Sequence, residues 1–555
     1  MSCFFLCKKF DASSSYQTAD SDSGTESTNS TAATIDTALT TMSTIGELSN
    51  QERAEFASFS RVAACLINEK LVESRFTDAM VTIFHPGSSD EITIQLAQKP
   101  IVSGFIHPTE LGTDIAYNGI SIRLKGSCMM NIFGKWAGLD VSKFLLELDN
   151  SAINLEAAYD NPPPIISLNS LPVDWEQSII EGHSIHPWHK CRYPAVDDFK
   201  TAKLYFVAMP RDQLNVVGEY NTWMKEIVTV DVEKDRTVLP VHEIQLSKVL
   251  EIFPDAQVLP QTITGRPQSS LRTISVASPD FCIKIPLPIK ATSIFRTIRP
   301  WAITIGHRLE PVLQVIERTV SDFGGSLIIA REFAAAASQS EHLGCIIRES
   351  TESIASRTGD RIIVCVAMIE HIDAIWGDDF DKAVVLREFC RQLFRATLPS
   401  VLLHGFALQA HFQKLLIRID PVTRAIRGFV ARDMGLFRVH QPTFLESTSL
   451  DIDTSLMSTS FDTLDKIYAY ILMLVHDNVA SMIRALKLGG MLPWRIAREE
   501  LERFVLPGNE RAMRIWLSSP TRDARAYLSM QLLEVVSECQ VVEAPNCFFH
   551  CQYNE

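Results

Sequence analysis

The stretch LLIRIDPVTRAIRGFV, residues 415–430, decides the fold class of this chain. Residues 415–419 and 426–430 are rich in apolar and β-branched side chains, and residues 420–425 between them begin with Asp-Pro, a turn-forming pair. The pattern predicts a β-hairpin. Amphipathic runs with helical spacing flank it, at residues 311–323, 380–395, 461–487 and 523–538. The second half of the chain is therefore predicted to be mainly helical around a small sheet.

The first half of the chain combines one amphipathic helix with short strands. A helical repeat of apolar residues follows Ser49 and Asn50, either of which can cap the helix. Alternating apolar and polar residues at 80–84 and 92–94 are typical of strands, and residues 200–300 contain more of them. We therefore predict a mixed α/β fold with a strand-rich middle and a mainly helical C-terminal half.

Composition changes divide the chain into four predicted parts. Residues 1–46 are rich in Ser and Thr and hold few large apolar residues, so they are predicted to form a disordered tail. The run Pro162-Pro163-Pro164 is a stiff break. We predict an N-terminal domain over 47–165, a strand-rich domain over 166–310 and a mainly helical domain over 311–555.

Overall charge and composition exclude several classes of protein. The 555 residues carry a formal net charge of −14, which disfavours non-specific binding to nucleic acid. The sequence contains no run of 18 apolar residues, so no membrane span is predicted. The 12 cysteines are scattered without a CxxC pair, which is typical of reduced thiols, and we expect a cytoplasmic protein.

Residues 181–192, EGHSIHPWHKCR, place His183, His186 and His189 at three-residue intervals. Pro187 interrupts any helix, and no nearby set of Cys or carboxylate residues completes a zinc site of familiar spacing. The pattern leaves three interpretations open. It is a zinc site, a loop at a domain edge, or a cationic loop that presents His and Lys side chains to an anion.

A second cluster runs from Ser270 and Arg272 to Lys284. If a hairpin turns near Ser278, Arg272 lies opposite Lys284, and such a pair of like charges is destabilising unless an anion lies between them. On this interpretation Ser270 and Arg272 share one strand face. The alternative is a pair of solvated surface charges.

A third cluster is KATSIFRT, residues 290–297. If this segment is helical, Thr292 and Arg296 lie on one face, and the guanidinium fork of Arg296 can bind a carboxylate with two hydrogen bonds. The alternative is the start of an ordinary surface helix.

A fourth cluster contains His404 and His411, which share a face if one helix spans both. Histidines in a buried core remain the alternative. Asp433 follows the predicted hairpin, and a carboxylate at a strand end can hold Mg²⁺. The chain has no GxxxxGK[ST], GxGxxG, GxSxG or HExxH motif, so the familiar ATPase, dehydrogenase, hydrolase and metalloprotease signatures are absent.

Taken in order, these clusters resemble the signature segments of the IucA/IucC family of siderophore synthetases, which act independently of nonribosomal peptide synthetases. The resemblance covers roughly residues 48–540 and rests on five segments: 182–192, 270–273, 290–297, 404–413 and 432–435. It implies a cupped-hand architecture of thumb, fingers and palm.

The resemblance also implies a function. The enzyme would use ATP and Mg²⁺ to adenylate a carboxylate of citrate or a related polycarboxylic acid, and an amine or alcohol would then attack the adenylate. A homodimer is a further expectation. The implied phosphate-binding residues are Ser270, Arg272, Thr273 and Lys284. His183 would lie between nucleotide and acid. The implied acid-binding residues are Thr292, Arg296, His404, His411 and Gln413. Asp433 would contact the nucleotide or Mg²⁺.

The sequence departs from the family pattern at four places. Ser184 replaces a Pro, Tyr193-Pro194 follows Arg192 where Gly is common, Gln409 replaces a Glu, and Lys414 replaces an Asn. The last two changes make the site more cationic, by one unit each. Two other functions stay open: a kinase-like phosphotransferase, which would release ADP where adenylation releases AMP, and a degenerate family member that binds without turnover.

Overall fold

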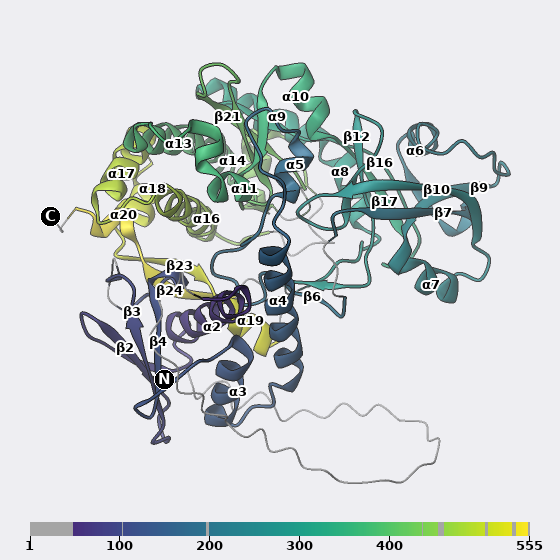
Figure 1. Ribbon diagram of the computed structural model, residues 1–555. Helices are drawn as coiled ribbons and strands as arrows, with labels where there is room; N and C mark the ends of the chain where they lie inside the picture. The colour runs from purple at the N-terminus through teal and green to yellow at the C-terminus, as the bar shows by residue number, and fades with distance from the viewer. Residues whose placement is uncertain are drawn as a thin grey trace, which may run out of the picture.

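The computed structural model describes residues 48–100, 102, 104–195, 199–292, 294–433, 435, 437–452, 460–505, 509–534 and 540–552. The predicted tail over 1–46 lies outside these residues. Within them, no helix is long and apolar enough to cross a membrane. Figure 1 shows three parts arranged around a common centre: a lower N-terminal unit, a strand-rich unit at the right and a helical unit at the upper left.

The N-terminal unit packs helices against an antiparallel sheet of strand order β1-β2-β3-β4-β5. Ser49 caps its first helix and forms a capping box with Glu52, as the sequence predicts. Phe59 and Leu66 of that helix are fully buried against the sheet. The elements are α2 (Asn50–Asn68), β1 (Glu73–Phe76), β2 (Met80–Phe84), β3 (Glu91–Leu96), η2 (Pro108–Glu110), β4 (Leu111–Tyr117), β5 (Ile120–Ile122), α3 (Gly126–Ala137) and α4 (Ser142–Asp160).

The strand-rich unit is built on an eight-stranded sheet of order β8-β16-β17-β12-β11-β10-β7-β9. All its neighbouring strands are antiparallel. Its elements are α5 (Pro172–Gln177), β6 (Arg192–Tyr193), β7 (Ala202–Pro210), η3 (Arg211–Gln213), β8 (Asn215–Val217), α6 (Tyr220–Met224), β9 (Arg236–His242), α7 (Glu243–Ile252), β10 (Gln257–Pro267), β11 (Thr273–Ser275), β12 (Phe281–Lys284), β13 (Lys290–Ala291), β14 (Ile294–Phe295), α8 (Ala302–Arg308), β16 (Glu332–Ala337) and β17 (Gly344–Glu349).

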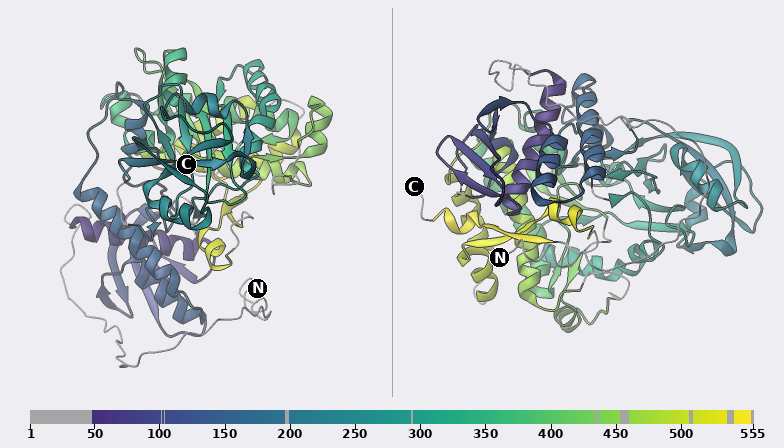
Figure 2. Two further views of the ribbon diagram at one scale, coloured as in Figure 1. Left: turned by 90° about the vertical axis from the view of Figure 1, so that its right-hand side faces the viewer. Right: turned by 90° about the horizontal axis from the view of Figure 1, so that it is seen from below.

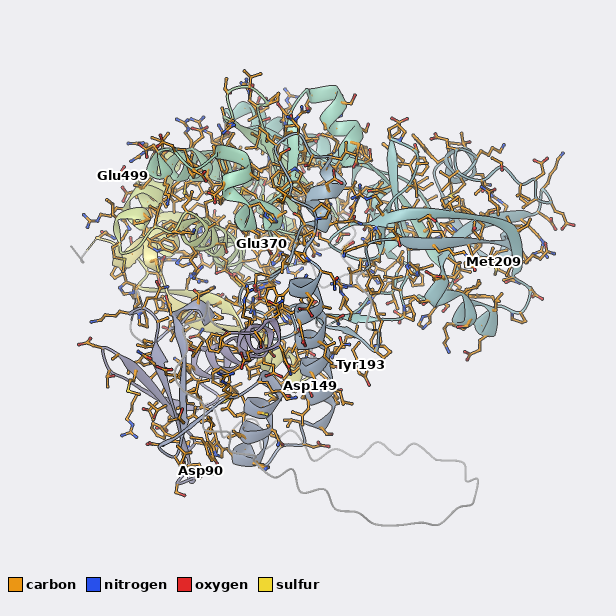
Figure 3. The ribbon with its side chains drawn as sticks, viewed as in Figure 1. Asp90, Asp149, Tyr193, Met209, Glu370 and Glu499 are labelled. Carbon is orange, nitrogen blue, oxygen red and sulfur yellow. The ribbon has the colours of Figure 1, made fainter. Side chains whose placement is uncertain are left out.

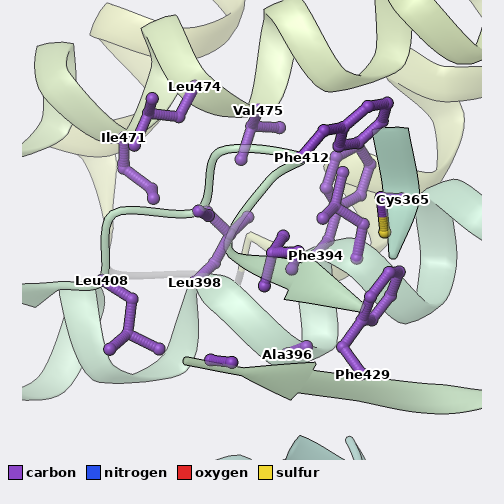
Figure 4. Packing of buried hydrophobic residues seen from close by; sticks show 14 of the residues in the cluster. Cys365, Phe394, Ala396, Leu398, Leu408, Phe412, Phe429, Ile471, Leu474 and Val475 are labelled. Carbon is purple, nitrogen blue, oxygen red and sulfur yellow. The ribbon is translucent and has the colours of Figure 1, made fainter. Parts of the chain in front are cut away.

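The helical unit surrounds a four-stranded sheet of order β15-β21-β20-β18, in which the predicted hairpin 415–430 forms the two central strands. Phe394, Phe412 and Phe429 pack in its core beside Cys365 (Figure 4). Its elements are α9 (Glu310–Asp322), β15 (Leu327–Ile329), α10 (Thr351–Thr358), β18 (Arg361–Val364), α11 (Cys365–Glu370), α12 (Ile372–Trp376), α13 (Lys382–Thr397), α14 (Pro399–His404), β19 (Phe406–Ala407), β20 (Leu415–Ile419), β21 (Ile426–Ala431), β22 (Arg438–Val439), α15 (Gln441–Thr448), α16 (Leu464–Ala485), α17 (Leu492–Phe504), α18 (Glu510–Met513), η5 (Arg514–Ser518) and α20 (Cys547–His550).

Two predictions about the organisation are wrong in detail. The boundary at 310/311 does not separate two cores, because β16 and β17 return to the eight-stranded sheet. The helix predicted over 523–538 is instead strand β23 (Thr521–Arg525), paired with β24 (Val541–Pro545), followed by the short helix α19 (Tyr527–Leu532). The right panel of Figure 2 shows this yellow C-terminal segment beside the purple N-terminal helices, where Leu528 joins the N-terminal core.

Candidate active site

A cleft of about 760 Å³ lies where the three parts meet. Figure 3 places Glu370 near this centre, with Asp90, Met209 and Glu499 toward the outer ends of the three parts. Among the lining residues are five that the sequence predicts as site residues, namely His183, Thr292, Arg296, His411 and Gln413. The cleft therefore joins segments that lie more than two hundred residues apart in the chain.

Glu370 at the end of α11 holds the loop that carries His183. Its carboxylate accepts backbone N–H bonds from Ile180 and Gly182, both at 2.7 Å, and from Glu181 at 3.2 Å. Gly182 has φ +68°, a conformation that glycine adopts without a steric penalty. Burial raises the pKa of Glu370, against the opposing charge of Lys190. The loop is thus fixed by one side chain of the helical unit.

His183 packs between side chains from two distant segments. Its ring stacks on His411 with 5.1 Å between centroids, and its Nε2 lies 3.0 Å from the hydroxyl of Tyr527. Burial lowers the pKa of His183 to about 3, with Arg525 and Arg61 adding to the effect. Burial likewise lowers the pKa of His411 well below its usual value. Both imidazoles are therefore neutral near pH 7, and each Nδ1 accepts a backbone N–H, from Ile185 in His183 and from Gln413 in His411, which places the ring proton on Nε2.

Cationic side chains gather around Asp433 beside the cleft. Lys284 forms an ion pair with Oδ1 of Asp433, and Nζ of Lys414 lies 3.4 Å from Oδ2. Although burial opposes it, the charges of Lys284, Lys414 and Arg272 hold the pKa of Asp433 well below its usual value. Burial lowers the pKa of Lys414 to about 8. One carboxylate thus faces three cations, which leaves a positive surplus for an anionic ligand.

Arg296 extends this positive surplus into the cleft. Burial and the nearby charge of Arg272 lower its pKa to about 10, so Arg296 remains charged at pH 7. Its Nε atom is buried and has no hydrogen-bond partner in the described part of the chain. A buried guanidinium donor without an acceptor is costly, and an anion bound in the cleft would satisfy it.

The strand register between residues 270 and 284 differs by one residue from the register predicted from the sequence. Thr273, not Arg272, lies opposite Lys284 in the ladder between β11 and β12. Ser270 and Arg272 do not share a strand face, because Leu271 has φ +66° and the Ser270 hydroxyl donates to Oγ1 of Thr273 at 2.9 Å in a turn. Arg272 donates to the backbone oxygen of Thr297. The predicted phosphate-binding residues nevertheless remain next to the cationic cluster.

The segment 290–297 is a hairpin, and the predicted helix is wrong. Strands β13 and β14 pair across the turn at Thr292, which has φ +56°. Lys290 anchors the hairpin through two 2.7 Å contacts with the carboxylate of Glu147. Thr292 and Arg296 still line the cleft, as the sequence predicts. A hairpin places them there, and not the predicted helix.

His404 lies apart from the other candidate residues. Helix α14 ends at His404, and Gly405 then adopts φ +59°, so no helix continues to His411. The ring nitrogens of His404 lie 2.9 Å from hydroxyls of Thr319 and Ser447 in the helical unit. His404 does not line the cleft, and the structure gives it a packing role. Gln413 does line the cleft, and its side chain donates to the backbone oxygen of Ser269 at 3.1 Å.

Several residues of the centre carry no local sequence signal. Tyr527 and Arg525 come from the C-terminal segment, and Glu370 comes from an apolar helix. Arg432 lies in one of the five resembling segments, but its buried partner Glu176 lies 256 residues away in the sequence. Nη1 of Arg432 donates to Oε1 of Glu176 at 2.6 Å. Only the tertiary structure brings these pairs together.

The residues present fit a nucleotide triphosphate better than a protein-bound metal ion. The positive cluster and the unpartnered Nε of Arg296 suit phosphate oxygens. The described residues contain no group of three His, Cys, Asp or Glu that could hold a metal. Both carboxylate oxygens of Asp433 face lysines. The donor set therefore does not fit zinc at the histidine loop, whereas Mg²⁺ beside Asp433, which would need only one or two carboxylates in addition to phosphate oxygens, stays a prediction from the sequence.

Comparison with known proteins agrees with this geometry. Residues 172–370 match the IucA / IucC family, and residues 385–537 match the family described as ferric iron reductase FhuF-like transporter. The chain is 28% identical to the siderophore synthetase-like protein ankE of Aspergillus thermomutatus, over 71% of this chain and 72% of that protein. It is 26% identical to the siderophore synthetase rfs of Rhizopus delemar, over 72% of this chain and 70% of that protein.

Solved structures share the fold. The petrobactin biosynthesis protein AsbB of Bacillus anthracis superposes with a TM-score of 0.75 at 17% identity, covering 92% of this chain and 97% of AsbB. ATP-bound aerobactin synthetase IucA of Klebsiella pneumoniae gives a TM-score of 0.70 at 14% identity, covering 90% of this chain and 100% of IucA. The mixed α/β fold predicted from the sequence is confirmed. The chain is thus similar in sequence to NRPS-independent siderophore synthetases and has their fold, with the IucA / IucC family match confined to residues 172–370.

Proposed function

We propose that this chain uses ATP to adenylate a carboxylate of citrate or a related polycarboxylic acid and then joins it to an amine or alcohol. The relatives that it matches are named as siderophore synthetases, and the solved IucA structure of the same fold holds ATP. One observation carries the proposal for this chain: a surplus of buried cations and a neutral His183–His411 pair border the same cleft. The first suits triphosphate and carboxylate, and the second offers Nε2–H groups that suit hydrogen bonding to an acyl oxygen.

The charged side chains address the main barrier to the first step. A carboxylate that attacks a phosphate brings two anions together, and fixed cations lower the energy of that approach. Arg272, Lys284 and Lys414 would bind phosphate oxygens, and Arg296 would hold the acid beside them. Holding both reactants in one enclosed cleft also replaces a bimolecular encounter and limits hydrolysis of the adenylate.

The neutral histidines suit the second step. Attack of an amine or alcohol on the acyl group places negative charge on the acyl oxygen, and the Nε2–H group of a neutral imidazole such as His411 can stabilise that charge with a hydrogen bond. The hydroxyl of Tyr527 orients the ring of His183. No covalent intermediate with a protein nucleophile is needed.

The test is acid-dependent exchange of pyrophosphate into ATP, screened over citrate, succinate, 2-oxoglutarate and other di- and tricarboxylates. Hydroxylamine traps the adenylate as a hydroxamate for mass spectrometry. We expect exchange with at least one polycarboxylate and loss of about a hundredfold or more in Arg272→Ala and in Arg296→Ala. Arg75→Ala is the matched control, because Arg75 lies exposed on β1, where it pairs with exposed Glu91 and lies over the ring of Phe84.

The products separate the alternatives. Release of AMP and pyrophosphate supports adenylation, whereas release of ADP would establish a kinase-like phosphotransferase. Nucleotide binding without turnover on any acid or amine would indicate a degenerate binding protein. The identity of the acid and of its acceptor, a cytoplasmic location, participation of Mg²⁺ with the nucleotide and a homodimer stay predictions from the sequence and its family resemblance.

A further inference from the structure

A second cavity lies behind the histidine pair. It has a volume of about 140 Å³ and is enclosed between α2 of the N-terminal unit, α16 of the helical unit and β23. His183, His411 and Tyr527 line both this cavity and the main cleft. The stacked imidazoles thus border both spaces, so that the small cavity and the main cleft adjoin at His183 and His411.

The small cavity contains polar groups without partners. The guanidinium of Arg484 on α16 lines it and forms no hydrogen bond or ion pair with any residue that the structure describes. His107 is 5% exposed, and its buried Nε2 has no partner among the same residues. Buried donors without acceptors cost free energy unless a ligand satisfies them. The buried group is Nε2 of His107, whereas Arg484 is partly exposed inside the cavity and feels the charges of Glu110 and Asp477 without a direct ion pair. Together the two groups indicate a polar binding site.

The charge of the unpartnered group indicates the chemistry of the ligand. The nearby carboxylates already have partners, because Glu110 accepts from the backbone of His107 at 2.7 Å and Asp477 pairs with Arg522 at 3.1 Å. Arg484 is left with a free fork of donors, which matches a carboxylate. A ligand with an ammonium group in place of the carboxylate would leave Arg484 unpaired.

Resting on the proposed function, we propose that this cavity binds the acceptor and that the acceptor is an amino acid or hydroxy acid. Its carboxylate lies at Arg484 and its amine or hydroxyl points to the His183–His411 pair. The nitrogen or oxygen lone pair attacks the acyl carbon, a new C–N or C–O bond forms, and the bond from that carbon to AMP breaks. AMP leaves with the bonding electrons, and the proton of the acceptor passes to a phosphate oxygen of the departing AMP.

Paired acceptors test the proposal on the unmodified protein. Each amino acid is compared with the amine that lacks its carboxylate, such as serine with ethanolamine and ornithine with putrescine, by mass spectrometry of the condensed product. We expect the carboxylate-bearing member of a pair to be favoured by about tenfold or more in kcat/KM. A preference for the decarboxylated member in every pair would overturn the proposal.

Substitution of Arg484 tests the residue itself. Arg484→Met should reduce the preference within each pair to about twofold, and Arg484→Lys should retain part of it. Acid-dependent pyrophosphate exchange should stay within about twofold of the unmodified protein, because Arg484 does not line the nucleotide cleft. Arg75→Met on β1 is the control.

The two half-reactions distinguish the two proposals. Normal exchange with an unchanged acceptor preference in Arg484→Met would overturn the acceptor site and leave the proposed function standing. Absence of exchange in the unmodified protein with every acid would overturn the proposed function and the acceptor site together. If Arg484→Met fails to fold, the comparison of paired acceptors on the unmodified protein still tests whether the acceptor carries a carboxylate.

Discussion

Lys414 shows how one substitution changes the electrostatics of the site. Its ammonium lies 3.4 Å from the Asp433 carboxylate and 3.2 Å from the Asp433 backbone oxygen. The family pattern has an asparagine here, which is neutral and can act as an oxygen ligand. In this chain a fixed cation thus occupies the place beside Asp433 where a divalent ion would need ligands. Lys284 holds the other carboxylate oxygen.

We therefore predict that binding of ATP depends little on Mg²⁺ in the unmodified protein. Chelation of the metal should change the Kd less than about threefold, whereas in Lys414→Asn the same chelation should weaken binding about tenfold, since one buried cation has been removed. Equilibrium titration with a fluorescent ATP analogue measures both. Lys414→Arg is the charge-preserving control and should behave like the unmodified protein. Equal metal dependence in all three proteins would contradict the argument.

His404 and His411 illustrate opposite roles for the same residue type. His404 bonds to two hydroxyls within the helical unit, whereas His411 stacks on His183 at the cleft wall. Seven residues separate them, and Gly405 ends the helix between them. Spacing alone cannot distinguish these roles, because the helix end depends on a single glycine conformation.

We predict that His404→Ala reduces stability without changing adenylation. Two hydrogen bonds between neutral groups contribute about 1–2 kcal/mol together. Denaturant titration should show that loss, and the KM for the acid should stay unchanged. His411→Ala should instead lower the rate of condensation about a hundredfold or more. Loss of acid affinity in His404→Ala would restore it as a substrate-binding residue.

At the scale of elements, the central loop depends on a contact between units. Glu370 gathers three N–H groups of residues 180–182, and this curls the chain so that His183 faces the cleft. The loop has no regular secondary structure from Ile180 to Cys191. Its position is therefore set by tertiary hydrogen bonds and not by local propensity.

We predict that Glu370→Ala loosens this loop. Three backbone donors would lose a charged acceptor, and the free energy of local opening should fall by about 3 kcal/mol. Hydrogen exchange at residues 180–182 should then become about a hundredfold faster, while exchange in β7 of the strand-rich unit stays unchanged. Protection equal to that of the unmodified protein would show that other contacts hold the loop.

The elements show where prediction from sequence succeeded and where it could not. The hairpin over 415–430, the helix after Ser49 and the long helix of residues 464–485 were predictable, because their periodicity is strong and their ends carry caps or turns. The hairpin at Thr292 and the one-residue register difference at Thr273 were not. Both depend on non-glycine residues with positive φ, Thr292 and Leu271, which sequence patterns rarely signal.

Candidate residues were predictable only where a motif carries them. His183, Arg296 and His411 lie in recognised segments and converge on one cleft, as the sequence predicts. Glu370 and Tyr527 lie in segments without a motif. They reach the site because the chain returns to the centre from the helical unit and from the C-terminal segment, which no local pattern indicates.

At the scale of the whole molecule, the C-terminal segment packs against the N-terminal unit. Helix α19 begins after Ala526, whose methyl side chain cannot cap it. The side chain that caps α19 is Glu69, which directly follows α2 in the N-terminal unit. Its carboxylate accepts N–H bonds from Leu528 at 2.8 Å and Ser529 at 2.6 Å, and a third bond from the Ser529 hydroxyl at 2.7 Å. This clamp places neighbouring Tyr527 against His183.

We predict that Glu69→Ala, at a residue that lies outside the main cleft but lines the small cavity, releases α19 and impairs condensation. The loss of one charged acceptor for three donors should cost about 3 kcal/mol, and Ser529→Ala, which removes only the hydroxyl bond, about 1 kcal/mol. Hydrogen exchange across residues 527–532 should rise in that order. The rate of condensation should fall with it, because Tyr527 no longer orients His183. Pyrophosphate exchange should change less, since the cations around Asp433 come from other elements. If both reactions fall equally, the C-terminal segment stabilises the whole cleft and not the histidine pair alone.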